Sequence, residues 1–194
     1  MPAAARPRLT PGRVYRTKNL LRWGANASRL AGRLVREGGL VRLGHGVFHC
    51  PRQSGFGPVP PGDRELMRGF LEDTPFLLTG PERWNALGLG TTAVFADQLV
   101  YNMKRSGRFR FGNRTYRLRR VRFPRNPEPE WFVVDLLENR DMAGVSLDSL
   151  ERALARAIGT GRWRPDTLRE TAATYGTRRT QAAVNRALEK AGVS

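Results

Sequence analysis

The segment 17–50 constrains the fold of this chain more than any other. It reads TKNLLRWGANASRLAGRLVREGGLVRLGHGVFHC. Thr17 is expected to cap a first short helix with its hydroxyl, and Gly24 is expected to end that helix in the left-handed conformation. Asn26 or Ser28 can start a second helix. The apolar residues of this second helix recur at helical spacing and predict one buried stripe, formed by Ala27, Leu30, Ala31 and Leu34.

Two strand-like runs follow the second helix. Gly38 and Gly39 are expected to stop the helix, and residues 40–43 and 47–49 read as strands joined by a tight turn. Gly44 and Gly46 are expected to give this turn its positive φ values. Helix, turn, basic helix and two-stranded hairpin is the plan of a winged helix-turn-helix, whose second helix enters the major groove of DNA.

The polar side of this segment supplies the candidate DNA-binding residues. Side chains near the start of the second helix are best placed to reach base edges, whereas arginines farther along it more simply meet phosphates. Residues at the hairpin turn can lie along the minor groove or the backbone. The predicted DNA-binding set is Arg16, Lys18, Asn26, Ser28, Arg29, Arg33, Arg36, Arg42 and His45.

The run RLVREGGLVRLGHGVFHCP resembles the N-terminal winged helix of AbiEi-type antitoxins of bacterial type IV toxin–antitoxin systems. The family pattern G-x-L-x-R-L-x-x-G-V-[FY] is matched by Gly39, Leu40, Arg42, Leu43, Gly46, Val47 and Phe48. The resemblance continues more loosely through PFLLTGPERWNALGLG, FRFGNRTYRLRRV and WFVVDLLENRD, and it is weak beyond about residue 142. One departure is that residues 1–16 contain three prolines and Gly12, so the family's first helix is expected to be short or missing.

The charge of the chain favours a nucleic-acid partner. The formal net charge is +17, and residues 1–57 carry 11 basic residues against the single acid Glu37. Such a surface attracts phosphates at long range and binds them in a salt-dependent manner. The alternative is that part of this arginine excess is ordinary solvated surface.

A proline- and glycine-rich stretch divides the chain. Residues 51–62, PRQSGFGPVPPG, predict a linker or an extended connection rather than a helix or a central strand. We therefore expect a winged helix-turn-helix DNA-binding domain over 1–57, able to bind DNA alone, and an antitoxin-like α/β domain over 58–194. The expected fold class is α+β, with a small antiparallel sheet and a helical C-terminal tail. The expected elements of the second domain are a helix capped by Asp63, strands at 76–79, 99–102 and 130–134, a helix at 81–87, and helices at 147–158, 165–175 and 178–191.

A second basic segment follows in the predicted hairpin of residues 104–122. Arginines alternate there with aromatic residues around Gly112 and Asn113, which predicts one basic and one apolar face. The basic face is either the solvated side of a sheet or a second surface for nucleic acid or an acidic partner. Its candidate residues are Arg108, Arg110, Arg117, Arg119 and Arg120.

The sequence offers no catalytic constellation, so we expect a protein that is not an enzyme and that needs no cofactor. His45, His49 and Cys50 lie close together but lack a fourth ligand at suitable spacing, so no metal site is predicted. Asp135 is expected to cap a helix that begins near Leu136. The start of the chain lacks the apolar region of a secretory signal, no run is long enough to span a membrane, and the single Cys50 fits a reducing cytoplasm.

These observations predict a DNA-binding regulator. The resemblance implies in addition that it represses its own promoter, with double-stranded DNA containing inverted repeats as the partner. It also implies that the chain counters a cognate nucleotidyltransferase-like toxin without forming a stable complex with it. The alternative is an interaction module that binds RNA or a partner protein through the basic hairpin, and an endonuclease is disfavoured because the catalytic set is missing.

Overall fold

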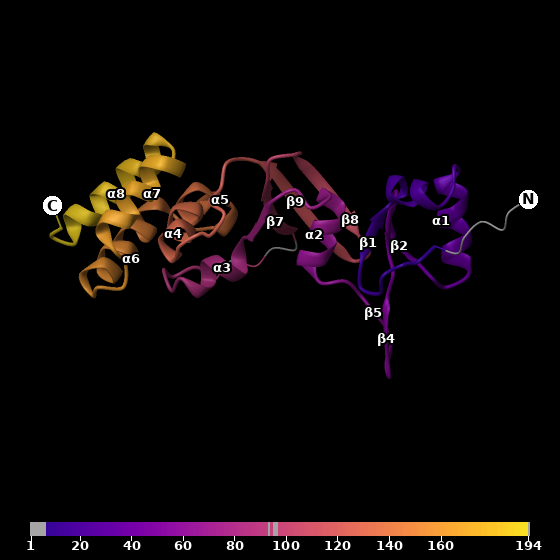
Figure 1. The fold of residues 1–194 in the computed structure, drawn as a ribbon. Coiled ribbons are helices and arrows are strands. Elements are labelled where there is room, and N and C mark those ends of the chain that lie inside the picture. The colour runs from indigo at the N-terminus through magenta and orange to yellow at the C-terminus, as the bar shows by residue number, and fades with distance from the viewer. Residues whose placement is uncertain (1–6, 93, 95–96, 194) are drawn as a thin grey trace, which may run out of the picture.

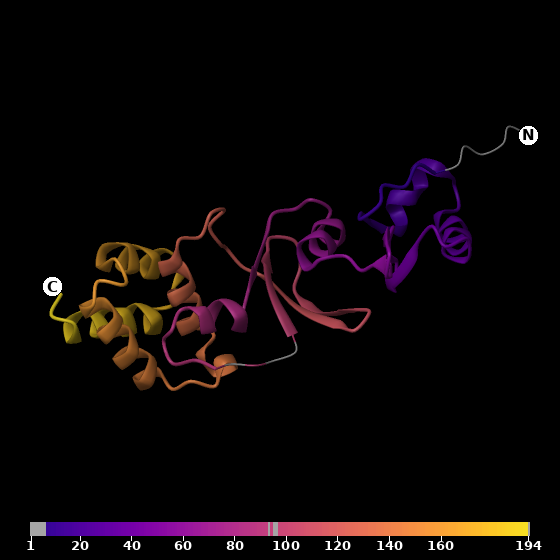
Figure 2. The same cartoon turned by 90° about the horizontal axis from the view of Figure 1, so that it is seen from below.

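The computed structural model describes residues 7–92, 94 and 97–193. Residues 1–6 and 194, which belong to the two predicted domains, lie outside the described residues. The chain is elongated and has three parts: a small unit at the N-terminal end, a sheet in the middle and a group of helices at the C-terminal end (Figure 1 and Figure 2). The expected α+β class is confirmed.

The N-terminal unit packs one helix against a small antiparallel sheet. Its strands are ordered β1-β3-β2, and each neighbouring pair runs antiparallel. Residues 7–13 contain no helix. The elements are β1 (Val14–Arg16), η1 (Thr17–Trp23), α1 (Ala27–Arg36), β2 (Val41–Gly44) and β3 (Val47–His49).

The first helical segment differs from the prediction. It is a 3-10 helix, and the backbone N–H of Arg16 donates to Oδ1 of Asn19 at 2.7 Å, whereas Thr17 makes no capping bond. Gly24 has φ of 171°, which is extended rather than left-handed. In the turn that follows β2, Gly46 has the expected positive φ of 65° but Gly44 does not.

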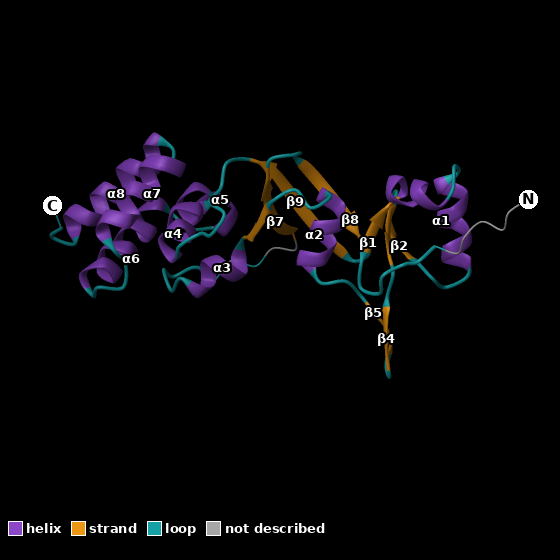
Figure 3. Cartoon of the chain, in the orientation of Figure 1, coloured by secondary structure: helices purple, strands orange, loops and turns teal. Residues whose placement is uncertain are grey.

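The proline-rich stretch forms a second hairpin. Strand β4 (Arg52–Ser54) pairs with β5 (Gly57–Val59), and the pair projects from the body of the molecule (Figure 3). The extended conformation was predicted from the sequence, but the pairing was not. The predicted boundary between residues 57 and 58 falls inside β5.

The middle part is a four-stranded sheet covered on one face by a helix. Strand order is β6-β7-β9-β8. An antiparallel sheet was predicted, but β7 runs parallel to β9. Asp63 was expected to cap the covering helix, but it is the first helical residue, and its carboxylate accepts hydrogen bonds from Arg114 and Tyr116. The elements are α2 (Asp63–Leu71), β6 (Phe76–Thr79), β7 (Asp97–Asn102), β8 (Gly107–Phe111) and β9 (Arg114–Arg120).

The C-terminal part is helical. The predicted strand at 130–134 is wrong, because Pro129 begins a helix there and both sides of the apolar run are buried. The three last helices agree with the prediction to within one residue at each end. The helices are α3 (Pro81–Ala86), α4 (Pro129–Glu138), α5 (Arg140–Ala143), α6 (Leu147–Gly159), α7 (Pro165–Tyr175) and α8 (Arg178–Lys190).

The N-terminal unit is packed against the middle part rather than tethered to it. Val14 and Val47, from β1 and β3, belong to the same buried cluster as Phe70 of α2 and Tyr116 of β9. A Cβ added to Gly69 of α2 would lie only 2.6 Å from Cβ of Val14, so the two backbones meet without room for a side chain. The relative placement of α1 and the middle sheet is therefore set by a shared core.

Candidate nucleic-acid interface

Helix α1 presents the exposed basic side that its sequence predicts. Oδ1 of Asn26 accepts a hydrogen bond from the backbone N–H of Arg29 at 2.9 Å, so the Asn26 side chain caps the helix. Ala27, Leu30, Ala31 and Leu34 are buried in the core of the N-terminal unit, as predicted. This burial directs the opposite side outward, and the exposed residues there are Ser28, Arg29, Arg33 and Arg36.

The β2–β3 hairpin lies beside the same side of α1. Arg42 and His45 are exposed, and the guanidinium of Arg42 lies 5.8 Å from the ring centre of Phe48. A groove of about 220 Å³ between α1 and the hairpin is lined by Ser28, Gly32, Arg42 and His45, among others. The structure thus brings Ser28, Arg42 and His45 of the predicted set together.

Arg16 and Lys18, also in the predicted set, form ion pairs with Glu72 instead. Lys18 Nζ lies 2.5 Å from Oε1 of Glu72, Arg16 Nη1 lies 3.5 Å from Oε2, and Lys104 pairs with the same carboxylate. Burial alone would raise the pKa of Glu72, but the hydrogen bonds from Lys104 and Lys18 outweigh it and hold the pKa at about 2. These ion pairs tie the N-terminal unit to the end of α2. No local sequence pattern indicates these ion pairs, because residues 16–18 and 72 meet only in the folded chain.

The basic residues predicted in the hairpin 104–122 lie on both faces of the middle sheet. Register places Arg108 opposite Arg117 and Arg110 opposite Thr115, so these side chains share one face, whereas strand alternation places Arg120 on the other face. Arg119 is half-buried, and its Nη1 donates to Oδ1 of Asn139 at 2.7 Å. The residues of this set that stay exposed on the open face are Arg108, Arg110 and Arg117.

One carboxylate lies under this open face. Asp97 is buried, Arg108 Nη2 lies 2.8 Å from its Oδ1, and Arg117 Nη2 lies 3.6 Å from its Oδ2. The hydrogen bond from Arg108 holds the pKa of Asp97 below its usual value. The face therefore keeps a net positive charge, with two arginines that share one acid and Arg110 without an ion pair among the described residues.

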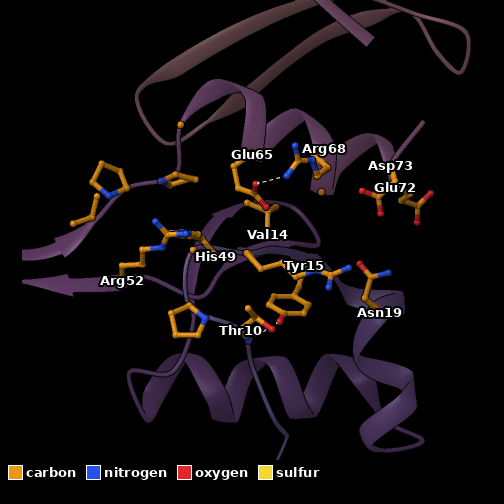
Figure 4. Close-up of a pocket in the computed structure, with 18 of the residues that line it drawn as sticks. Thr10, Val14, Tyr15, Asn19, His49, Arg52, Glu65, Arg68, Glu72 and Asp73 are labelled. Carbon is orange, nitrogen blue, oxygen red and sulfur yellow. Dashed lines mark hydrogen bonds and ion pairs between the residues drawn. The ribbon is translucent and has the colours of Figure 1, made fainter. Parts of the chain in front are cut away.

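A cleft of about 920 Å³ lies between the N-terminal unit and α2, beside the contact of Val14 with Gly69 (Figure 4). Arg13, Arg52 and the buried His49 line one wall, and Glu65, which accepts a hydrogen bond from Arg68 Nη1, lies on the other. Burial lowers the pKa of His49, and its Nε2 has no hydrogen-bond partner in the described part of the chain. No local sequence pattern indicates this cleft, because its walls come from separate parts of the chain.

Asp135 does not cap a helix, which corrects the prediction. It lies inside α4 and is buried, and its carboxylate accepts hydrogen bonds from Thr79, Trp84, Tyr101 and Asn139 at 2.5–3.0 Å. Burial raises the pKa of Asp135 despite these bonds. Three of the donors come from β6, α3 and β7, and the fourth caps α4 itself, so this carboxylate is a structural group that joins α4 to the sheet and to α3.

Neither a metal cluster nor a membrane-spanning helix occurs in the described ranges. No group of three or more His, Cys, Asp or Glu side chains there is placed to hold a metal ion. The helices of those ranges are too short or too polar to cross a membrane.

A comparison with models of known protein families finds none that matches this chain, and a comparison with curated proteins finds no match either. The resemblance to AbiEi-type antitoxins therefore remains a prediction from the sequence.

Proposed function

We propose that this protein is a DNA-binding transcriptional regulator whose N-terminal unit is a winged helix-turn-helix. The observation that carries the proposal is the pairing of α1 with the β2–β3 hairpin. Arg29, Arg33 and Arg36 line the exposed side of α1, and Arg42 and His45 lie across a groove from that side. In a winged helix-turn-helix, α1 would enter the major groove and the hairpin would lie along the adjacent backbone.

Within this proposal the side chains have different tasks. Ser28 and Arg29, in the first turn of α1, would reach base edges. Arg33 and Arg36 would contact phosphates. Asn26 would fix the start of the helix through its capping bond, and Arg16 and Lys18 would hold the unit against α2 through Glu72.

The wider biological role rests on the resemblance stated from the sequence. We propose that the chain represses its own promoter and serves as the antitoxin of a type IV system, in which it counters a nucleotidyltransferase-like toxin. The antitoxin activity would reside in residues 58–194. A co-transcribed nucleotidyltransferase gene beside this one would support this role.

The proposal is tested with a reporter driven by the DNA upstream of the protein's own gene. Wild type should repress the reporter. In a binding assay on duplex DNA, Arg29→Ala should weaken binding to the specific site by about 1–3 kcal/mol and should change binding to a random duplex little. Arg125→Ala, an exposed arginine in the loop after β9, is the matched control. Equal weakening on both duplexes would make Arg29 a phosphate contact only, and binding of RNA instead of duplex would favour the interaction module.

A further inference from the structure

The turn between β8 and β9 is in direct contact with the β2–β3 hairpin. The backbone N–H of Gly112 donates to the carbonyl of Leu43 at 2.8 Å. A Cβ added to Gly44 would lie 3.2 Å from the carbonyl oxygen of Arg110 and 3.2 Å from the ring of Phe111. Two segments about 70 residues apart in the sequence therefore meet backbone to backbone, and Figure 1 shows β8 beside β1 and β2.

This contact is supported by the core beneath it. Phe111 of β8 is buried in the same cluster as Val14 and Val47 of the N-terminal sheet, and Leu43 packs against that cluster. The ring of Phe70 lies 4.8 Å from that of Phe111, edge to face. The β8–β9 turn is therefore fixed relative to α1 and the β2–β3 hairpin, and this rigidity lowers the cost of binding one ligand with both.

The charge of the joined surface has one sign. Residues 98–117 contain six basic residues and no acid, and residues 38–62 contain no acid either. Arg42, His45 and Arg110 are exposed around the contact, and Nε of Arg110 donates to the carbonyl of Gly112, which holds its guanidinium at the turn. Asp97 and Asp63 are ion-paired with Arg108 and Arg114, which belong to β8 and β9.

We infer that the β8–β9 turn belongs to the same double-stranded DNA surface as α1 and the β2–β3 hairpin, with Arg110 as a phosphate contact. This inference rests on the proposed function. Arg108 lies two residues away on the same strand, about 7 Å from Arg110 on the same face, and adds a second basic side chain along the duplex. The bound DNA thus reaches beyond the N-terminal unit onto the middle sheet.

The test measures the salt dependence of full-length protein binding to a 30-base-pair random duplex by fluorescence anisotropy. Arg110→Ala should lower the affinity about fivefold near 0.1 M salt and reduce the slope of log K against log salt by about 0.9, as expected for one lost phosphate contact. Arg33→Ala on α1 should do the same. Arg125→Ala should change neither quantity, although it removes the same charge from an exposed loop.

The outcomes separate the inference from the proposed function. If Arg33→Ala weakens binding and Arg110→Ala matches wild type, the inference is wrong and the proposed function stands. If wild type does not bind duplex, the proposed function is wrong. Tighter binding of a 30-nucleotide single-stranded RNA, weakened by Arg110→Ala, would assign the turn to RNA and overturn the inference. Thermal melting of Arg110→Ala should match wild type, because the side chain is exposed.

Discussion

At the scale of single residues, the Asp135 carboxylate shows how a buried charge is accommodated. Both of its oxygens accept hydrogen bonds, and Asn139 Nδ2 and Trp84 Nε1 are N–H donors that cannot become acceptors in place. A flip of the Asn139 amide would turn its NH2 group toward Arg119, which donates to its oxygen. The network therefore requires an acceptor with two free oxygens at position 135.

Asp135→Asn should destabilise the protein by about 3 kcal/mol, because the new amide hydrogens would face donors inside the core. Chemical denaturation measures the change in the free energy of unfolding. Asp141→Asn, at a side chain that is 87% exposed, is the control and should change that free energy by less than about 0.5 kcal/mol. Equal stability of the two variants would contradict a structural role for Asp135.

Glu72 makes the free energy of unfolding depend on pH. Its folded pKa of about 2 lies below the ordinary value of 4.5, so its contribution is present above about pH 4.5 and is lost as the pH falls toward 2. Discounted for the partly exposed lysines, this contribution is about 1–2 kcal/mol.

Denaturation curves recorded between pH 6 and pH 2.5 measure this effect. Glu72→Gln should be less stable than wild type at pH 6 and nearly equal to it at pH 2.5. Glu37→Gln, at an exposed residue that pairs with Arg33 at 3.8 Å, should leave the pH dependence unchanged. A parallel loss for wild type and Glu72→Gln would show that other carboxylates dominate.

At the scale of elements, the close approach of α2 and β1 decides how the N-terminal unit sits. Gly69 permits the approach, because an added Cβ would lie 2.7 Å from the Val14 carbonyl oxygen as well as 2.6 Å from its Cβ. A clash with backbone cannot be relieved by a change of rotamer. Gly69 lies in the last turn of α2, where a glycine costs helix propensity, and this contact explains its presence.

Gly69→Ala should therefore destabilise the protein by about 1–3 kcal/mol, even though alanine is the better helix former. Gly62→Ala, at the other end of α2, is the matched control, because nothing lies within 4 Å of its added Cβ and its φ is −68°. Thermal unfolding of both variants measures the difference. If Gly69→Ala proved as stable as Gly62→Ala, the packing of β1 on α2 would be looser than the structure shows.

At the scale of the whole molecule, the core consists of three buried clusters, and two of them meet at the N-terminal sheet, where Val14 belongs to one and Tyr15 to the other. Val14 and Val47 are 2% and 1% exposed because α2 and the middle sheet cover them. A fragment of residues 1–57 would expose both valines and lose the Glu72 ion pairs.

We therefore expect the fragment 1–57 to melt at a lower temperature, and to bind duplex DNA more weakly, than a fragment of residues 1–122 that keeps α2 and the middle sheet. Circular dichroism and anisotropy on the two fragments measure these differences. Equal stability and affinity would show that the N-terminal unit is independent, as the sequence alone predicts.

The sequence by itself determined the local elements. Residue spacing and short-range interactions predict the apolar stripe of α1, the capping side chain of Asn26 and the three last helices. All of these agree with the structure. The prediction of a strand at 130–134, in α4, was wrong because an apolar run that is buried on both sides has no period that separates helix from strand. The exposed basic residues of α1 could also be predicted, since burial of one side of a helix leaves the opposite side exposed.

Only the tertiary structure decided which elements meet. The parallel pairing of β7 with β9, the ion pairs of Arg16 and Lys18 with Glu72, and the contact of Gly112 with Leu43 join residues that are distant in the sequence. No local pattern encodes such partners, because a side chain's charge or an edge's free N–H does not specify which distant group satisfies it. The division of the basic residues into exposed and paired ones therefore became visible only once the chain was folded.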